Sequence, residues 1–417
     1  MIEEIYDNEG SEVDWSDSDV EQEEASVPIN MSSDSSDSDA ELRTRVDQSR
    51  GYPPSRVRGR TRGRTVRGSR ITGSQQRSDT EKDWKIEGSV QDIPFSSIPG
   101  LSNASNINEN LSPFQVFHIF VNNDIISHIK RETNRYAAQQ IAAQKRKGPI
   151  SKNSVFSRWK PVTISEIECF LAIILHMGFV RKPRIRDYWS TNPIYDSKFA
   201  SSLQISRDRF FSMLTFLHLN NNDTYIPRGN PGHDPLYKLR PVFNKLMNDF
   251  HTFYIPDEEL TVDEGICGFR GRVHFRVFIK GKPEKYGMKL FFLCEATSGY
   301  VCMAEVYTGS TDKEGYNSAF SVVDRLVTPY YNKGHTIYMD RWFTSPKLFD
   351  HLWQNGTKAV GTVMPNRREM PKQAFQQKLK KGERVSRRRE HLLAVKWRDV
   401  RDVYILSTKH DDEMVET

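Results

Sequence analysis

Two aspartates, each at the end of a short apolar run, are the residues of this 417-residue chain best suited to chemistry. Asp263 follows Leu260-Thr-Val262, and Asp340 follows Thr336-Ile-Tyr-Met339. Residues that suit a turn or a new helix come after each, so both carboxylates can point at one place above a sheet. Hard divalent cations such as Mg²⁺ prefer oxygen ligands, and a pair of such ions can activate water at a phosphodiester. The aspartate pair therefore indicates DNA chemistry.

The elements around the two aspartates are predicted to alternate in a definite order. After residue 256 the hydrophobic period shifts towards two, which is typical of strands. Strands are expected at 260–262, 273–279, 289–296, 300–307, 335–339 and 358–363, with helices at 318–330 and 346–355. Three of the first four strands, then helix, strand, helix and strand, give the order of a ribonuclease H-like core. In that order the first carboxylate lies on strand one and the second ends strand four, where Asp263 and Asp340 stand.

Residues 109–255 are predicted to be all-helical. Ser112-Pro113 offers an N-cap followed by a proline at the first helical position. Thr163 and Glu166 have the spacing of a capping box ahead of an apolar run. Ser206 is expected to cap a third helix, and a fourth is expected over 239–254. The aromatic residues here are assigned to the core.

Residues 1–108 are predicted to be disordered, because they are too polar to bury the surface that would offset the entropy of ordering. The first 41 residues contain 15 acidic residues and no Lys or Arg. The segment 56–67 is instead an Arg-Gly tract, which favours a nuclear address or a nucleic-acid-binding arm, with a solvated linker as the alternative.

The remaining residues, 42–417, contain 60 basic and 39 acidic residues, a net charge of +21. A body this basic indicates a polyanionic partner. The four cysteines form no C-x-x-C pair, which favours reduced thiols in an intracellular protein. The longest apolar run, 169–180, is too short to cross a bilayer, so no membrane partner is expected.

Several short motifs, in order, resemble those of the piggyBac transposase family. They are Leu260-Thr-Val-Asp-Glu264, Gly268-Phe-Arg-Gly-Arg272, Lys282-Pro-Glu-Lys-Tyr-Gly-Met-Lys289, Asp340-Arg-Trp-Phe-Thr-Ser345 and Val360-Gly-Thr-Val363. The resemblance covers about residues 112–410. It implies metal-dependent cut-and-paste transposition at TTAA sites, binding of double-stranded DNA at transposon terminal repeats, a homodimer and a nuclear location. Its cofactor is Mg²⁺ or Mn²⁺, held by three aspartates (a DDD motif), of which Asp263 and Asp340 resemble the first two.

The sequence departs from the family pattern after residue 364. The third aspartate of the family follows an insertion in a Gly-Gly-Val-Asp-like segment, and no such segment occurs here. The Cys-rich zinc-binding tail is also absent, so no zinc is expected. We interpret the chain as C-terminally truncated and catalytically inactive or severely impaired. Two functions stay open: a non-catalytic, domesticated nuclear DNA-binding or chromatin protein, or a fragment of an active transposase.

Basic residues near the aspartates and in the segment 365–417 are the candidate DNA contacts, with a solvated surface as the alternative reading. They are Arg270, Arg272, Lys282, Lys285, Lys289, Arg341, Arg367, Arg368, Arg387, Arg388 and Arg389. Trp342 and Phe343 are assigned to packing rather than base stacking, and His274 and His335 to structural roles.

The expected fold class is therefore α+β. A disordered tail (1–108) precedes an all-helical dimerisation and DNA-binding region (109–255). An incomplete ribonuclease H-like α/β core (256–364) follows, and then a basic insertion region with a truncated C-terminus (365–417).

Overall fold

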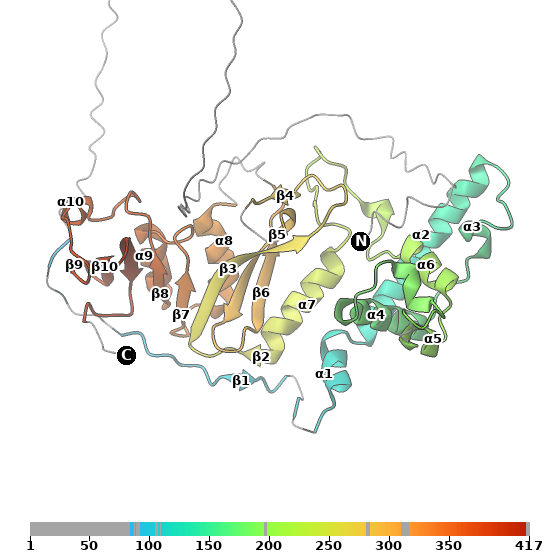
Figure 1. Cartoon of the computed structure of the whole chain (residues 1–417), viewed down its shortest axis with the longest axis horizontal. Coiled ribbons are helices and arrows are strands. Elements are labelled where there is room, and N and C mark those ends of the chain that lie inside the picture. Colours follow the sequence, from blue (N-terminus) through green and yellow to red (C-terminus); the bar gives the residue numbers. More distant parts are fainter. Residues whose placement is uncertain are drawn as a thin grey trace, which may run out of the picture. The chain divides into compact units, whose positions relative to one another are not determined.

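The computed structural model describes residues 84–86, 88, 92–104, 107–108, 110–195, 198–280, 284–309 and 317–413. The described part is a mixed α+β structure (Figure 1). The predicted disorder of 1–83, the Arg-Gly tract and the candidate DNA contact Lys282 lie outside the described residues. Within the described part, no helix is both long and apolar enough to cross a membrane.

The elements described between residues 113 and 253 are helices. They are α1 (Pro113–Phe120), α2 (Asn123–Lys147), α3 (Val155–Arg158), α4 (Ile164–Phe179), α5 (Phe199–Ser202), α6 (Arg207–Phe216) and α7 (Arg240–Phe253), with the 3-10 helices η3 (Ile185–Trp189) and η4 (Asn222–Thr224). Their core includes the stacked rings of Phe170 and Phe210, whose centroids are 4.9 Å apart.

The helix starts follow the capping chemistry of the sequence. Ser112 and Gln115 form a capping box at α1, and Thr163 and Glu166 form one at α4. The Ser206 hydroxyl accepts the N–H of Arg209 at the start of α6. These three predicted starts are confirmed, and α7 agrees with the predicted helix to within one residue at each end.

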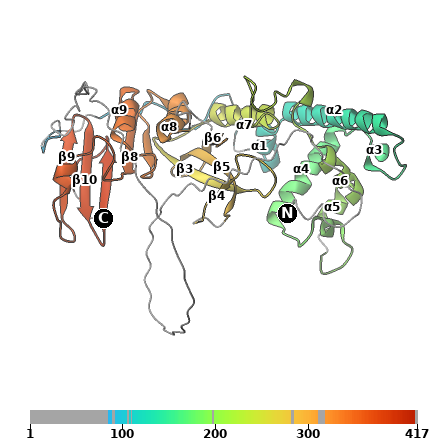
Figure 2. The same ribbon diagram turned by 90° about the horizontal axis from the view of Figure 1, so that it is seen from above.

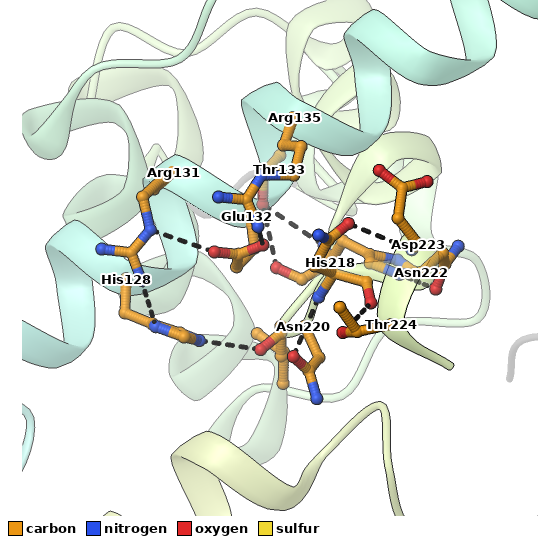
Figure 3. Close-up of polar contacts among 12 residues, drawn as sticks. His128, Arg131, Glu132, Thr133, Arg135, His218, Asn220, Asn222, Asp223 and Thr224 are labelled. Atoms are coloured by element: carbon orange, nitrogen blue, oxygen red, sulfur yellow. Dashed lines mark hydrogen bonds and ion pairs between the residues drawn. The ribbon is translucent and has the colours of Figure 1, made fainter. Parts of the chain in front are cut away.

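Helix α2 is fixed to the loop after α6 by a polar cluster (Figure 3). The ring Nε2 of His128 lies 2.8 Å from the Leu219 carbonyl oxygen, and the Thr133 hydroxyl accepts the N–H of His218. Glu132, only 3% exposed, pairs with the two arginines beside it on α2. A buried carboxylate is costly unless it is paired, so these arginines allow α2 to carry a charge at its buried face.

A nine-stranded sheet follows, in the order β4-β5-β3-β7-β8-β11-β10-β9, with β6 paired to β5. Its strands are β3 (Glu259–Gly268), β4 (Val277–Phe278), β5 (Tyr286–Glu295), β6 (Val301–Val306), β7 (Thr336–Met339), β8 (Lys358–Thr362), β9 (Arg384–Arg389), β10 (Leu392–Arg398) and β11 (Asp402–Ser407). Strands β3, β7 and β8 are parallel neighbours, and the other pairings are antiparallel. The strand predicted over 273–279 shortens to the two residues of β4.

Helices α8 (Ala319–Val327) and α9 (Pro346–Gln354) lie on one face of the sheet (Figure 2). Their apolar side chains share a core with alternate residues of the central strands, such as Leu260 and Val262 of β3 and Ile337 of β7. Because side chains alternate between the two faces of a strand, Thr261 and Asp263 point to the opposite face.

The basic C-terminal region extends the same sheet. Strands β9, β10 and β11 form an antiparallel meander, which joins β8 through β11 at the pair Ile405↔Thr362. Strands β9 and β10 were not predicted from the sequence. Besides their basic residues, these strands carry buried apolar side chains on the inner face, including Val385, Leu392 and Ala394.

Part of the segment expected to be disordered packs against the sheet. Trp84 is 9% exposed, belongs to the main core, and its indole N–H donates to the Glu369 carbonyl at 3.0 Å. Lys85 exchanges two backbone hydrogen bonds with Arg388 at the edge of β9. Further on, β1 (Gly100–Leu101) pairs with β2 (Tyr254–Ile255). The folded part therefore begins before residue 108, because Trp84 in this polar segment packs into the hydrophobic core.

Candidate functional site

The register between β3 and β7 brings the two aspartates together. These parallel strands are paired up to Val262↔Met339, and the next residue along each chain is an aspartate, Asp263 and Asp340. Neighbouring strands lie about 4.8 Å apart, so two exposed carboxylates stand side by side, Asp263 within β3 and Asp340 directly after β7. Two residues far apart in the sequence thus meet through strand pairing.

Each carboxylate has one oxygen engaged by backbone N–H groups. Asp263 Oδ1 accepts the N–H of Glu264 at 2.7 Å. Asp340 Oδ1 accepts the N–H groups of Trp342 at 2.8 Å and Phe343 at 3.4 Å. Asp340 thereby holds a turn that leads to α9, whose N-cap is Ser345 followed by Pro346. The second oxygen of each aspartate has no hydrogen-bond partner among the described residues.

Cys294 also faces Asp263. It lies opposite Thr261 in the β3–β5 register, on the same face of the sheet as Asp263. Burial, and then the negative charge of Asp263, raise the pKa of the Cys294 thiol. The thiol is therefore held in its neutral form, which makes it a poor ligand for a hard cation.

The fit of a divalent cation to this place can be judged from the donors present. Two adjacent carboxylates suit Mg²⁺ or Mn²⁺, which keep several waters and often take only one or two protein carboxylates. Across the residues that the structure describes, no three acidic, His or Cys side chains gather as a metal-binding group. The residues present thus fit one weakly held cation, with water completing its coordination.

Aromatic side chains support the turn that begins at Asp340. Phe343 is 1% exposed, and the half-buried Trp342 ring stacks on Phe291 with an interplanar angle of 7°. The ammonium of Lys289 lies 4.9 Å from the Trp342 ring centroid and 4.8 Å from that of Phe291. The assignment of Trp342 and Phe343 to packing is confirmed.

Five of the candidate DNA contacts are exposed cations. Arg270, Arg272 and Lys285 lie exposed beyond the carboxyl end of β3 and the start of β5, and Arg341 is exposed directly after Asp340. Arg368, between β8 and α10 (Lys372–Phe375), is also exposed. These residues can offer positive charge to a polyanion.

The other predicted cations lie differently. Arg388 is 5% exposed and pairs with Asp411, and Arg389 pairs with Asp350 at 2.6 Å and with Glu369 at 3.5 Å. Arg387 is half-buried and donates to the carbonyl of its neighbour Ser386 at 2.7 Å. Their charges act within the fold, a role that the run of three arginines gave no means of predicting.

Arg367 is likewise turned inward. One of its guanidinium nitrogens donates to the carbonyl oxygens of Arg341, at 3.2 Å, and of Trp342. It therefore contacts the backbone of the turn that carries Asp340. Sequence reasoning identified the charge of Arg367 but not these acceptors.

The two histidines assigned to structural roles lie in different surroundings. His335, fully buried, places Nδ1 3.0 Å from the Asp257 carbonyl oxygen, and burial lowers its pKa. His274 precedes β4, where partial burial first, and then the charges of Arg228 and His233, lower its pKa.

Comparison with known proteins gives a consistent result. A family model described as Transposase IS4 matches residues 112–417. Human PiggyBac transposable element-derived protein 2 is 29% identical over 311 residues, which are 72% of this chain and 48% of that protein. Human PiggyBac transposable element-derived protein 3 is 31% identical over 261 residues, 60% of this chain and 40% of the relative. This chain thus spans about half or less of these relatives.

A solved structure is also similar. The cryo-EM structure of the piggyBac transposase synaptic complex with hairpin DNA superposes with a TM-score of 0.64 at 26% sequence identity. The match covers 77% of this chain and 65% of that chain.

Proposed function

Because this chain belongs to the piggyBac transposase family, we propose that it is a transposase-derived nuclear protein that binds double-stranded DNA and holds a divalent cation at Asp263 and Asp340. The observation that carries this proposal is the pairing of β3 with β7, which sets two exposed carboxylates side by side. Among the exposed arginines, Arg341 directly follows Asp340, and Arg270 and Arg272 follow the end of β3. Negative groups for a cation and positive groups for phosphates are what a protein acting on DNA requires.

The sheet supports a ribonuclease H-like core as the scaffold of this site. Strands β6, β5, β3, β7 and β8 lie side by side in that order, with the first three antiparallel and the last three parallel. Helix α8 connects β6 to β7, and α9 connects β7 to β8. We assign the first carboxylate of such a core to Asp263 on its first strand and the second to Asp340 after its fourth.

In this proposal Asp263 and Asp340 hold the cation through the oxygens that the backbone leaves unused. A bound Mg²⁺ or Mn²⁺ would lower the pKa of water and stabilise a leaving oxygen at a phosphodiester. The N–H groups of Trp342 and Phe343 orient the Asp340 carboxylate, and Glu264 does the same for Asp263. Arg270, Arg272 and Arg341 would position the DNA backbone.

Strand cleavage requires more than these groups supply. In-line displacement between two metals usually takes more ligands than two carboxylates. We therefore propose that the 417-residue polypeptide binds DNA without cutting it. Incubation of the purified chain with Mg²⁺ and a cognate transposon end tests this: product no greater than that from an Asp263→Asn variant is expected, and Asp263-dependent nicking would contradict it.

DNA as the partner is supported by the structural neighbour, which was solved as a complex with hairpin DNA. By resemblance, the DNA recognised would be the terminal repeats of a transposon, the joining sites would be TTAA, and the protein would act as a homodimer through its helical region. A nuclear location follows from a DNA partner.

The dependence of DNA affinity on salt tests this function. Each phosphate contact contributes about −0.9 to the slope of log K against log salt concentration. We expect a steep negative slope for the full chain. Replacing both Arg270 and Arg272 by alanine should make the slope shallower by about 2.

The control is Lys347→Ala, because Lys347 is exposed on α9, on the other face of the sheet. Its slope should equal that of the unsubstituted chain. A shallow slope for the full chain, or an equal change in both variants, would contradict the proposed DNA-binding surface.

A further inference from the structure

Arg367, which lies outside the turn from Asp340 to Thr344, donates hydrogen bonds to the backbone of this turn. We propose that Arg367 is a positioning residue for Asp340, acting through the backbone of this turn rather than on DNA phosphate. The inference rests on the proposed function, because it concerns the orientation of the cation-binding carboxylate. It changes the role of a residue whose charge and sequence position favoured a DNA contact.

The hydrogen bonds of the turn explain why it needs an external donor. The N–H groups of Trp342 and Phe343 point towards the Asp340 carboxylate, and the Thr344 N–H and hydroxyl both donate to the Asp340 carbonyl. The carbonyls of Arg341 and Trp342 are left to be satisfied from elsewhere. The hydrogen bond to the Trp342 carbonyl lies at a partly buried position, where an acceptor without a partner is costly. Arg367 donates to this carbonyl and also to the exposed carbonyl of Arg341.

The chemistry of arginine suits this task. Both hydrogen bonds come from one terminal nitrogen, Nη2, and the planar guanidinium holds the two N–H groups of that nitrogen in fixed directions. A lysine ammonium is a compact charge on a flexible stem, so its N–H groups are not held in fixed directions. Arg367 also has its Nε buried without a partner among the described residues. Arg367 is half-buried, with Nε inside the protein and Nη2 bonded to the backbone of the turn.

The side chains of the turn are fixed from the other direction. Phe343 is buried in the core, and Trp342 stacks on Phe291. Arg367 fixes the backbone between these anchors and Asp340. With both restraints the carboxylate of Asp340 is held beside Asp263; without Arg367 the peptide units that orient it can rotate.

The neighbouring Arg368 provides a matched control. It has the same charge, lies one residue away and is exposed. In the full chain we would compare Arg367→Ala, Arg367→Lys and Arg368→Ala by hydrogen exchange of the Trp342 and Phe343 amides, by Mn²⁺ affinity, and by the salt dependence of DNA binding. If Arg367→Ala does not fold, Arg367→Lys provides the comparison, because it keeps the positive charge and a side chain of similar length.

If Arg367 positions Asp340, both Arg367 variants exchange the two amides at least about tenfold faster, and Mn²⁺ binds about 10–100-fold more weakly. Arg367→Lys leaves the salt slope unchanged. Arg368→Ala changes neither the exchange nor the Mn²⁺ affinity.

Unchanged exchange in both Arg367 variants would overturn the proposal. A shallower salt slope with unchanged exchange would assign Arg367 to phosphate instead. If the unsubstituted chain binds no Mn²⁺, the proposed cation site fails, and amide exchange alone decides the role of Arg367.

Discussion

Gly361 shows how tightly the residues around Asp340 are packed. It lies on β8 opposite Met339, and a Cβ built there would be 2.4 Å from the Thr344 hydroxyl oxygen and 2.5 Å from the Met339 carbonyl oxygen. Met339 directly precedes Asp340, and Thr344 ends the turn that begins at Asp340. Because any side chain at this position would collide with these two atoms, only glycine lets β8 lie this close to Met339 and Thr344.

Gly361→Ala is therefore expected to lower the free energy of unfolding by about 1–3 kcal/mol, since neither backbone nor turn can yield without displacing its neighbours. Chemical denaturation measures this. Gly178→Ala is the control, because Gly178 lies on α4 with nothing within 4 Å of the added Cβ; stability there should be unchanged or rise by up to about 1 kcal/mol. Equal effects of the two substitutions would refute this account of Gly361.

Single residues differ in how far the sequence could specify their roles. The aspartates were predictable because each follows a short apolar run, and the parallel pairing of β3 with β7 then brings them together. The basic residues were not, because a sequence shows a positive charge but not its partner. Arg270 and Arg388 read alike, yet one is exposed and the other is buried against Asp411.

At the scale of elements, the described residues between Trp84 and Ser102 contact parts of the chain that are distant in sequence. Trp84 lies under the guanidinium of Arg389, which is 5.3 Å from its ring centroid, and Asp92 pairs with Lys358 at the start of β8. Ser102 donates to the Phe253 and Thr252 carbonyls at the end of α7. The segment thus connects β9 to α7.

Trp84→Ala should cost about 3–5 kcal/mol of unfolding free energy, the usual range for a buried tryptophan. It should also speed amide exchange in β9, which loses the support of Lys85. Ile86→Ala is the matched control: Ile86 is 72% exposed, so the change is expected to stay within about 0.5 kcal/mol. If Trp84→Ala behaved like Ile86→Ala, the packing role of this segment would be wrong.

Elements were predictable where local chemistry marks them. Ser112, Thr163 and Ser206 each start a helix with a hydrogen bond encoded within three residues. Strands β9 and β10 escaped prediction because their partners are remote and their charges mask the buried alternation. Lys396 illustrates this: it is buried, and its ammonium donates to the carbonyls of Phe375 and Gln377.

For the whole molecule, five histidines with lowered pKa values set the response to mild acid. Loss of solvent around the ring, complete only for His335, is the first cause that lowers the pKa of His218, His251, His274, His335 and His410. The unfolded chain binds protons on these groups near pH 6.5, whereas the folded chain resists protonation. Their contribution to stability is therefore present above about pH 6.5 and is lost as the pH falls below it.

We expect the urea midpoint to fall between pH 7.5 and pH 5.5. The carboxylates with lowered pKa, such as Glu258 and Asp412, lose their contribution only at lower pH. In His335→Phe the fall should be smaller, since a fully buried titrating ring has been removed. A midpoint that rises on acidification, or an identical fall in the variant, would contradict this assignment.

The fold class of the whole chain followed from the change of period near residue 256, and the mixed α+β architecture agrees with it. The extent of the sheet did not follow, since the meander β9–β11 joins β8 only through tertiary pairing. Family membership was indicated by motifs spaced along β3, β5, β7 and β8, the strands that surround the aspartates.

The measurement that tests the central claim most directly is a Mn²⁺ titration of the full chain, followed by electron paramagnetic resonance. We predict one site, weakened tenfold or more by Asp263→Asn and equally by Asp340→Asn. Asp208→Asn, at an exposed acid on α6, should leave it unchanged. Binding that survives both site substitutions, or that responds equally to Asp208→Asn, would show that Asp263 and Asp340 do not form a cation site.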